Sequence, residues 1–177
     1  MAGLQGKRVV ITRSREDWEE SAAAVRRRGG LPLACPMIDI LPPEDSAPLD
    51  GALRSLDTFD WIFFTSAHSV RCFFERAATL GVTGVPSAQV RLAVIGPATA
   101  AELARYHVHP HFTADRFTGA DFVVEFRRVY DVAGRRFLLP LSNLARATVA
   151  DALREARGEV TAVTAYRNAP VTTLPDE

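Results

Sequence analysis

The sequence predicts an α/β fold in which mostly parallel sheets are flanked by helices. Short apolar segments typical of buried strands alternate with amphipathic segments typical of helices along the whole chain. Hydrophobic residues make up 47% of the 177 residues, enough for a substantial core. Small and hydroxyl residues occupy the strand-to-helix junctions. The length suits one full domain or two small ones.

The charge balance excludes a nucleic-acid groove built on bulk positive charge. The chain has 21 basic and 21 acidic residues, a formal net charge of zero. An anionic partner would therefore be held by helix dipoles and a few arginines. No apolar run reaches the length of a membrane span, and the first residues lack the apolar core of a signal peptide. We expect a cytoplasmic protein that binds neither nucleic acid nor membrane.

The first segment is predicted to be a strand followed by a helix. Lys7–Thr12 has the composition of a buried parallel strand, and Ser14 or Asp17 could cap the helix after it. The extended stretch that follows is interrupted by prolines, which do not suit a central strand. Because such a stretch suits a crossing between two lobes, we place the first lobe boundary near Ile38–Pro43.

The stretch Phe59–Val70, FDWIFFTSAHSV, is the centre of the prediction. It begins as a buried strand after Asp60, breaks at Thr65-Ser66 and continues as a helix to about Leu80. This arrangement places two hydroxyl groups beside the first unbonded N–H groups of a helix. It therefore predicts a site for anionic oxygen.

Strands and helices continue to alternate to the end of the chain. Arg91–Ile95 is predicted to be a strand that turns directly into a helix at Gly96-Pro97-Ala98-Thr99, with Pro97 in the first turn. The other predicted elements are a helix at Leu49–Leu56, a strand at Val108–Phe112, a helix from Thr118-Gly119 to Val129, a strand at Arg136–Leu139, a helix at Ala145–Ala156 and a strand at Val160–Tyr166.

Four junctions should lie together at the carboxyl-end edge of the sheet. In a parallel sheet every strand-to-helix junction meets that edge, where helix dipoles present their positive ends. The alternative is that these residues are ordinary helix caps. The four junctions are Thr65-Ser66, Gly96–Thr99, Thr118-Gly119 and Ser142-Asn143.

Several common sites are missing from the sequence. It contains no G-x-G-x-x-G, no G-x-x-x-x-G-K-[ST] and no G-x-S-x-G, so dinucleotide, P-loop and esterase motifs are absent. His107, His109 and His111 alternate and would share one strand face, as metal ligands can. A solvated edge strand is the competing interpretation, and we favour it because Pro110 interrupts the run. We expect no metal and no cofactor.

Three stretches resemble, in order and spacing, the uroporphyrinogen-III synthase family. They are VVITR (Val9–Arg13), DWIFFTSAHSV (Asp60–Val70) and VIGPATA (Val94–Ala100), and the tail Leu139–Arg167 resembles the family's strand, helix and returning linker. The resemblance implies two α/β lobes joined by two linkers, with the substrate held between them.

The same resemblance implies a division of the chain. Residues 1–37 would form the first part of lobe 1, residues 38–43 a linker, residues 44–163 lobe 2 and residues 164–177 the returning linker. The rest of lobe 1 would lie beyond Glu177, so we expect a truncated or divergent chain. The strand Lys7–Thr12 would then lack neighbours and expose apolar surface. We expect either a dimer through the incomplete lobe or partial disorder of the first 36 residues.

The function implied by the resemblance is the closure of hydroxymethylbilane to uroporphyrinogen III, with inversion of the last ring and loss of water. Tyr166 matches a family tyrosine and is the candidate acid, unless it is a structural linker residue. A non-catalytic anion-binding or regulatory module on the same fold is the alternative function. Substrate-binding candidates are Arg13, Thr65, Ser66, Gly96, Pro97, Thr99, Ser142, Asn143 and Arg146.

Overall fold

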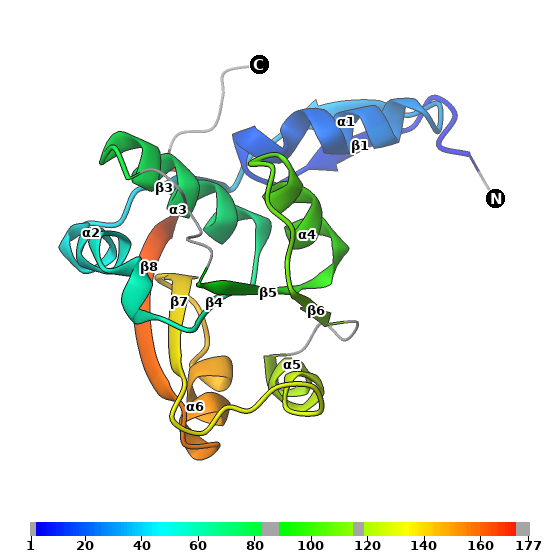
Figure 1. Cartoon of the computed structure of the whole chain (residues 1–177). Helices are drawn as coiled ribbons and strands as arrows, with labels where there is room; N and C mark the ends of the chain where they lie inside the picture. Colours follow the sequence, from blue (N-terminus) through cyan, green and yellow to red (C-terminus); the bar gives the residue numbers. More distant parts are fainter. Residues whose placement is uncertain (1–2, 83–88, 115–118, 173–177) are drawn as a thin grey trace. The chain divides into compact units, whose positions relative to one another are not determined.

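The computed structural model describes residues 3–82, 89–114 and 119–172. The chain forms two compact units (Figure 1). Unit 1 consists of residues 1–41 and 168–177, and unit 2 consists of residues 42–167. Among the described helices, none has the length and apolar character needed to cross a membrane.

Unit 2 is built on a parallel sheet with the strand order β8-β7-β4-β5-β6. Neighbouring strands in this order run parallel to one another, which confirms the predicted sheet type. The strands are β4 (Trp61–Phe64), β5 (Arg91–Ile95), β6 (Phe112–Ala114), β7 (Arg136–Ser142) and β8 (Glu159–Pro170).

Helices cover both faces of this sheet (Figure 1). Alternate residues of β4 point to opposite faces, so Phe63 joins the cluster formed with α5 and α6, whereas Phe64 packs edge-on against Phe73 of α3. Both phenylalanines of β4 are fully buried. The helices of unit 2 are α2 (Ala47–Arg54), α3 (Ala67–Thr79), α4 (Gly96–Ala104), α5 (Gly119–Phe126) and α6 (Thr148–Glu155), with a short 3₁₀ turn at Leu56–Thr58.

Unit 1 contains a small parallel pair, β1 (Arg8–Ile11) and β2 (Leu31–Ala34), with α1 (Trp18–Arg26) between them in sequence. A 3₁₀ turn at Arg15–Asp17 precedes α1, and neither Ser14 nor Asp17 caps a helix with its side chain. The expectation that the first strand lacks neighbours is therefore wrong, because β1 pairs with β2 along its length.

One face of the β1-β2 pair carries an exposed cluster of apolar side chains beside Arg8. Val10 is the register partner of Leu33, and Leu31 lies two residues before Leu33, so the three side chains share a face. Their exposed fractions are 57% for Val10, 55% for Leu31 and 42% for Leu33. The predicted exposure of apolar surface is thus confirmed.

Strand β3 (Ile38–Leu41) pairs with β8, which runs on past Arg167 to Pro170. Next to these strands, the backbone N–H of Val171 donates to the carbonyl of Met37 at 3.1 Å. The chain therefore passes between the two units twice, at residues 41–42 and 167–168.

The predicted strand Val108–Phe112 is misplaced. β6 begins only at Phe112, and His107 adopts a left-handed conformation with φ 58°. The three histidines therefore precede the strand and do not line one face of it. Within the described ranges, no group of three or more His, Cys, Asp or Glu side chains could hold a metal ion.

Candidate functional site

The carboxyl ends of β4, β5 and β7 meet at one edge of the unit 2 sheet. The strand register aligns Phe64 with Val94. Phe64 comes directly before the Thr65-Ser66 turn, and Val94 lies two residues before Gly96. On the other side, Ser142 is aligned with Tyr166 of β8. We call the residues at this edge the rim: Thr65, Ser66, Gly96, Pro97, Thr99, Ser142, Asn143 and Tyr166. The predicted common edge is confirmed for three junctions, while Thr118 of the fourth lies outside the described residues.

The Thr65-Ser66 junction is a well-formed helix start. Ser66 is the N-cap of α3, and its Oγ accepts a hydrogen bond from the Ser69 backbone N–H at 3.1 Å. The Ser69 hydroxyl returns a bond of 2.7 Å to the Ser66 carbonyl. This pairing satisfies one N–H of the first turn and fixes the Ser66 side chain in place. Thr65 beside it is half-buried.

The Gly96 junction is a helix start that no side chain caps. Gly96 has φ 76°, a left-handed conformation that favours glycine, and Pro97 follows in the first turn of α4. The N-cap residue of α4 is Ile95, whose side chain makes no capping hydrogen bond to the first turn. The positive end of the α4 helix dipole therefore lies at the rim. Thr99 is buried, with 3% of its surface exposed.

The Ser142-Asn143 junction differs from the prediction. β7 runs through Ser142, and α6 starts only at Thr148, where Ala147 provides no side-chain cap. Neither Ser142 nor Asn143 therefore lies at a helix N-terminus. The backbone N–H of Asn143 donates instead to the Tyr166 carbonyl at 3.1 Å, which ties the end of β7 to β8. Arg146 lies exposed in the connection that follows.

A β-bulge sets the direction of Tyr166. Leu141 aligns with Thr164 but Ser142 aligns with Tyr166, so β8 has one extra residue at this point. Without it, alternation would put Tyr166 on the same face as Thr164 and Val160, toward α5 and α6. The bulge turns Tyr166 toward α3 instead. Its hydroxyl lies 3.2 Å from Ser66 Oγ, and only 6% of the residue is exposed.

His68 is a second neighbour of Tyr166. The two rings meet edge to face with their centroids 5.7 Å apart. Arg71, one turn further along α3, lies with Nη2 2.9 Å from Nδ1 of His68. Because a guanidinium only donates, His68 Nδ1 accepts this bond and its ring proton is on Nε2.

A cavity of about 330 Å³ adjoins the rim at Asn143. Arg167 lines it, with Nε donating to the Pro42 carbonyl at 3.2 Å and Nη1 3.9 Å from a Glu44 carboxylate oxygen. The lining therefore mixes one cation with acidic side chains. The residues that line the cavity are Pro43, Glu44, Asp45, Pro48, Asn143, Thr164 and Arg167.

Arg13 belongs to unit 1 and is held there by local partners. Its guanidinium lies 3.0 Å from an Asp17 carboxylate oxygen and 3.5 Å from Ser21 Oγ. The neighbouring Ser14 Oγ is buried and has no hydrogen-bond partner among the described residues. Both residues line a cavity of about 220 Å³ within unit 1.

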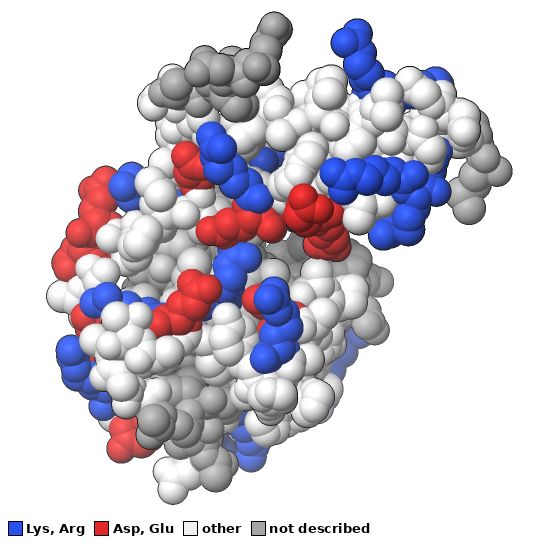
Figure 2. Space-filling view, turned by 90° about the horizontal axis from the view of Figure 1, so that it is seen from above, with Lys and Arg blue, Asp and Glu red and all other residues white. Residues whose placement is uncertain are grey.

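The surface charge is mixed. Figure 2 shows acidic and basic side chains interspersed over the face in view, with no broad field of one sign. This pattern agrees with the formal net charge of zero. An anionic ligand at the rim would depend on helix N-termini and individual arginines.

Comparison with known proteins identifies the family. The sequence profile described as uroporphyrinogen-III synthase HemD matches residues 19–177. The chain belongs to the uroporphyrinogen-III synthase family. Among relatives of this family, uroporphyrinogen-III synthase of Synechococcus elongatus is 30% identical over 177 residues, covering 98% of this chain and 65% of that protein. A putative uroporphyrinogen-III synthase of Methanocaldococcus jannaschii is 28% identical over 140 residues, or 78% of this chain and 55% of that one.

Solved structures of the uroporphyrinogen-III synthase family share the fold. A mutant uroporphyrinogen III synthase from Thermus thermophilus superposes with a TM-score of 0.67 at 21% identity, covering 94% of this chain and 64% of that one. The wild-type enzyme from the same organism, in a second crystal form, gives a TM-score of 0.58 at 23% identity. This family member thus spans just under two thirds of the length of these relatives.

Sequence reasoning missed three rim-side residues of this uroporphyrinogen-III synthase family member. His68 lies within the stretch that was singled out, yet only the fold shows that it meets Tyr166. Thr164 and Arg167 flank Tyr166 in sequence, and that proximity was the available signal. Their place beside Asn143 depends on the pairing of β7 with β8, which the sequence does not reveal.

Proposed function

We propose that this chain acts in the closure of hydroxymethylbilane to uroporphyrinogen III, with inversion of the last ring and loss of water. The observation that carries the proposal is the hydrogen bond of 3.2 Å between Ser66 Oγ and the Tyr166 hydroxyl. This hydrogen bond places a weak acid at the edge of the sheet where α3 and α4 begin. Family membership supports the choice of reaction.

The rim supplies sites for the carboxylate arms of such a substrate. The N-cap residue of α4, Ile95, makes no side-chain hydrogen bond to the first turn, and Pro97 and Ala98 in that turn are exposed. Helix N-termini bind anions through backbone N–H groups and through the helix dipole. Arg167 and Arg146 add cations on the β7 and β8 side. Several anions could therefore be held without net positive charge.

Tyr166 is the candidate acid for the departing hydroxyl. Ser66 Oγ already accepts from the Ser69 N–H, so its own proton is available to donate to the Tyr166 oxygen. In that arrangement the Tyr166 proton is directed to the substrate. After transfer, the phenolate oxygen keeps the Ser66 hydrogen bond beside the positive end of α3. The remaining catalytic work is to hold the substrate in the geometry for ring closure.

Unit 1 would also contribute to substrate binding. We propose that residues 38–43 and 164–177 act as the two linkers, with Arg13 as a counter-ion for substrate. Support comes from the two points at which the chain passes between units, 41–42 and 167–168. Arg13 lies just past β1, at the carboxyl-end edge of its own strand pair.

The test is an assay of ring closure with hydroxymethylbilane, with the ring isomers separated by chromatography. The proposal predicts the inverted isomer at a rate proportional to protein concentration. If the chain leaves the isomer ratio at its protein-free value, the proposal fails. Binding without closure, measured by calorimetry with hydroxymethylbilane, would favour the non-catalytic alternative.

A further inference from the structure

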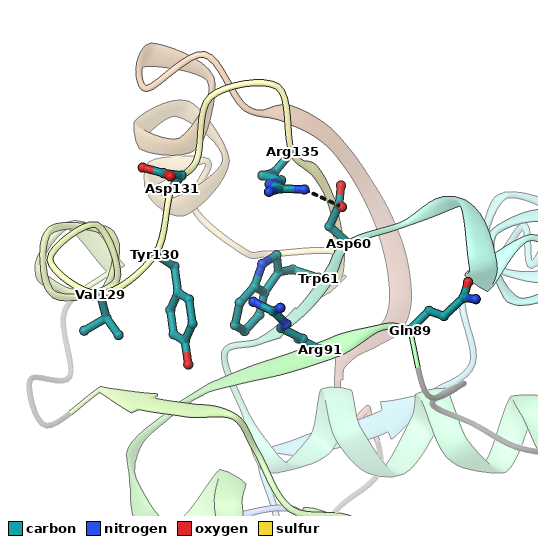
Figure 3. A pocket seen from close by; sticks show the side chains of 8 residues that line it. All are labelled: Asp60, Trp61, Gln89, Arg91, Val129, Tyr130, Asp131 and Arg135. Atoms are coloured by element: carbon teal, nitrogen blue, oxygen red, sulfur yellow. Dashed lines mark hydrogen bonds and ion pairs between the residues drawn. The ribbon is translucent and has the colours of Figure 1, made fainter.

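Another cavity lies at the amino-terminal edge of the unit 2 sheet, opposite the rim (Figure 3). Asp60 precedes β4 and Trp61 starts it, Arg91 starts β5, and Arg135 precedes β7. All four therefore lie at the edge away from the rim. The cavity has a volume of about 250 Å³. Its lining residues are Asp60, Trp61, Gln89, Arg91, Val129, Tyr130, Asp131 and Arg135.

Two aromatic rings and a stacked guanidinium form one wall. The rings of Trp61 and Tyr130 lie with centroids 4.7 Å apart, and Arg91 Cζ lies 5.5 Å from the Trp61 centroid and 5.9 Å from that of Tyr130. Trp61 is only 2% exposed and packs edge-on against Phe126 at 4.8 Å. The wall is therefore anchored in the core. Stacking uses the face of the guanidinium and leaves its N–H groups at the edges able to donate.

Some charged side chains around the cavity form ion pairs and others do not. Asp60 accepts from the Arg136 backbone N–H at 2.8 Å and from Arg135 Nη1 at 3.3 Å, so this carboxylate is neutralised. Across the described part of the chain, neither Arg91 nor Asp131 has an ion-pair partner. The guanidinium of Arg91 and the carboxylate of Asp131 therefore remain available to bind a charged ligand.

We propose that this cavity binds a small zwitterion of the amino-acid class. Its carboxylate would bind Arg91, its ammonium group would bind Asp131, and an apolar side chain would pack on Tyr130 and on Val129, which is 62% exposed. A volume of about 250 Å³ has room for a ligand of amino-acid size. Because the cavity and the rim lie at opposite edges of one sheet, this site is independent of the proposed ring closure.

The test is titration of the chain with phenylalanine, with binding monitored by tryptophan fluorescence and by calorimetry. The sequence has two tryptophans, so Trp18→Phe leaves Trp61 as the only emitter. We expect a saturable change in Trp61 emission with a Kd below about 1 mM. Loss of a charged partner should weaken binding at least about tenfold in Arg91→Gln and in Asp131→Asn. Arg127→Gln removes an exposed arginine outside the cavity and is the matched control.

Two analogues of phenylalanine test whether the site binds both charged groups of the ligand. Phenylalaninamide lacks the carboxylate and N-acetylphenylalanine lacks the ammonium group, so each should bind at least about tenfold more weakly than phenylalanine. Equal binding of either analogue, or no saturable signal with phenylalanine, overturns the proposal. These comparisons use a single background protein, so they hold even where Arg91→Gln loses the fold.

Discussion

The hydroxyl groups of Ser66 and Tyr166 lie 3.2 Å apart although the two residues are 100 positions apart in sequence. Ser66 begins α3 after the central strand β4, whereas Tyr166 lies in β8, with β7 between the two strands. The bond therefore spans three neighbouring strands at one edge of the sheet. It joins the helix cap of α3 to the candidate acid, so a change in either residue should affect the other.

Replacing Tyr166 by phenylalanine should slow ring closure. The ring and its packing remain, while the proton donor is lost, and general acid catalysis typically contributes at least about 100-fold. The measurement is the rate of formation of the inverted isomer from hydroxymethylbilane. Tyr106→Phe removes a hydroxyl from a ring stacked on Phe74 in α3, away from the rim, and should keep the wild-type rate. A Tyr166→Phe protein at full rate would exclude the acid role.

Replacing Ser66 by alanine should lower the free energy of unfolding by about 1 kcal/mol, since the N-cap of α3 is lost. Urea denaturation measures the difference. Ser66→Thr keeps an oxygen acceptor and should recover most of the stability. Ser55→Ala removes an exposed hydroxyl that bonds the Gly51 carbonyl, and should change stability by less than about 0.5 kcal/mol. Equal losses in Ser66→Ala and Ser55→Ala would argue against a capping role.

The Asp50–Arg76 ion pair should make stability depend on pH. Both carboxylate oxygens of Asp50 accept from Arg76 at 2.7 Å, joining α2 to α3. This hydrogen bonding lowers the pKa of Asp50 below its ordinary value of 3.8. A lowered folded pKa means that the stabilisation is fully present above about pH 4 and is lost as pH falls through the folded pKa.

Asp50→Asn should therefore be less stable than wild type at pH 7, and the gap should narrow below about pH 4. The urea denaturation midpoints of the two proteins at pH 7 and at pH 3 measure this difference in stability. Asp151→Asn breaks a more exposed pair with Arg154, 3.3 Å long, and should show little effect at either pH. A gap that is constant from pH 7 to pH 3 would contradict the assignment to Asp50 ionisation.

The exposed apolar face of β1 and β2 should promote self-association, and we propose a second copy of the chain as its partner. Val10→Thr combined with Leu33→Thr places strand-compatible threonine at both positions while removing apolar surface, so it should shift the chain toward monomer. Size-exclusion chromatography with light scattering measures the mass. Val124→Thr changes an exposed valine on α5, 52% exposed, and should leave the mass unchanged. A wild-type chain that is monomeric at all concentrations rules out this partner.

The sequence identified the elements whose signals are local. The strand Trp61–Phe64, its hydroxyl junction and the glycine turn at Gly96 are all marked by residues adjacent in the chain. Parallel pairing then followed from the alternation of strands and helices. For this reason the common edge could be predicted before any partner strand was known.

Features that depend on distant pairing could not be predicted in this way. The direction of Tyr166 depends on an extra residue in β8 relative to β7, and period-two alternation alone would turn the side chain to the other face. The late start of α6 at Thr148 was missed because Ser142 and Asn143 resemble caps while belonging to a longer strand and its exit. His107 was assigned to a strand face because the residue pattern does not reveal its left-handed backbone, with φ 58°.

The division of the chain has a consequence for biosynthesis. Unit 2 is a single continuous stretch, residues 42–167, whereas unit 1 combines the first 41 residues with residues 168–177. A ribosome therefore synthesises all of residues 42–167 before it reaches Val171. The hydrogen bond from Val171 to Met37 can form only after that point, so the N-terminal segment lacks this partner while the larger unit is being made.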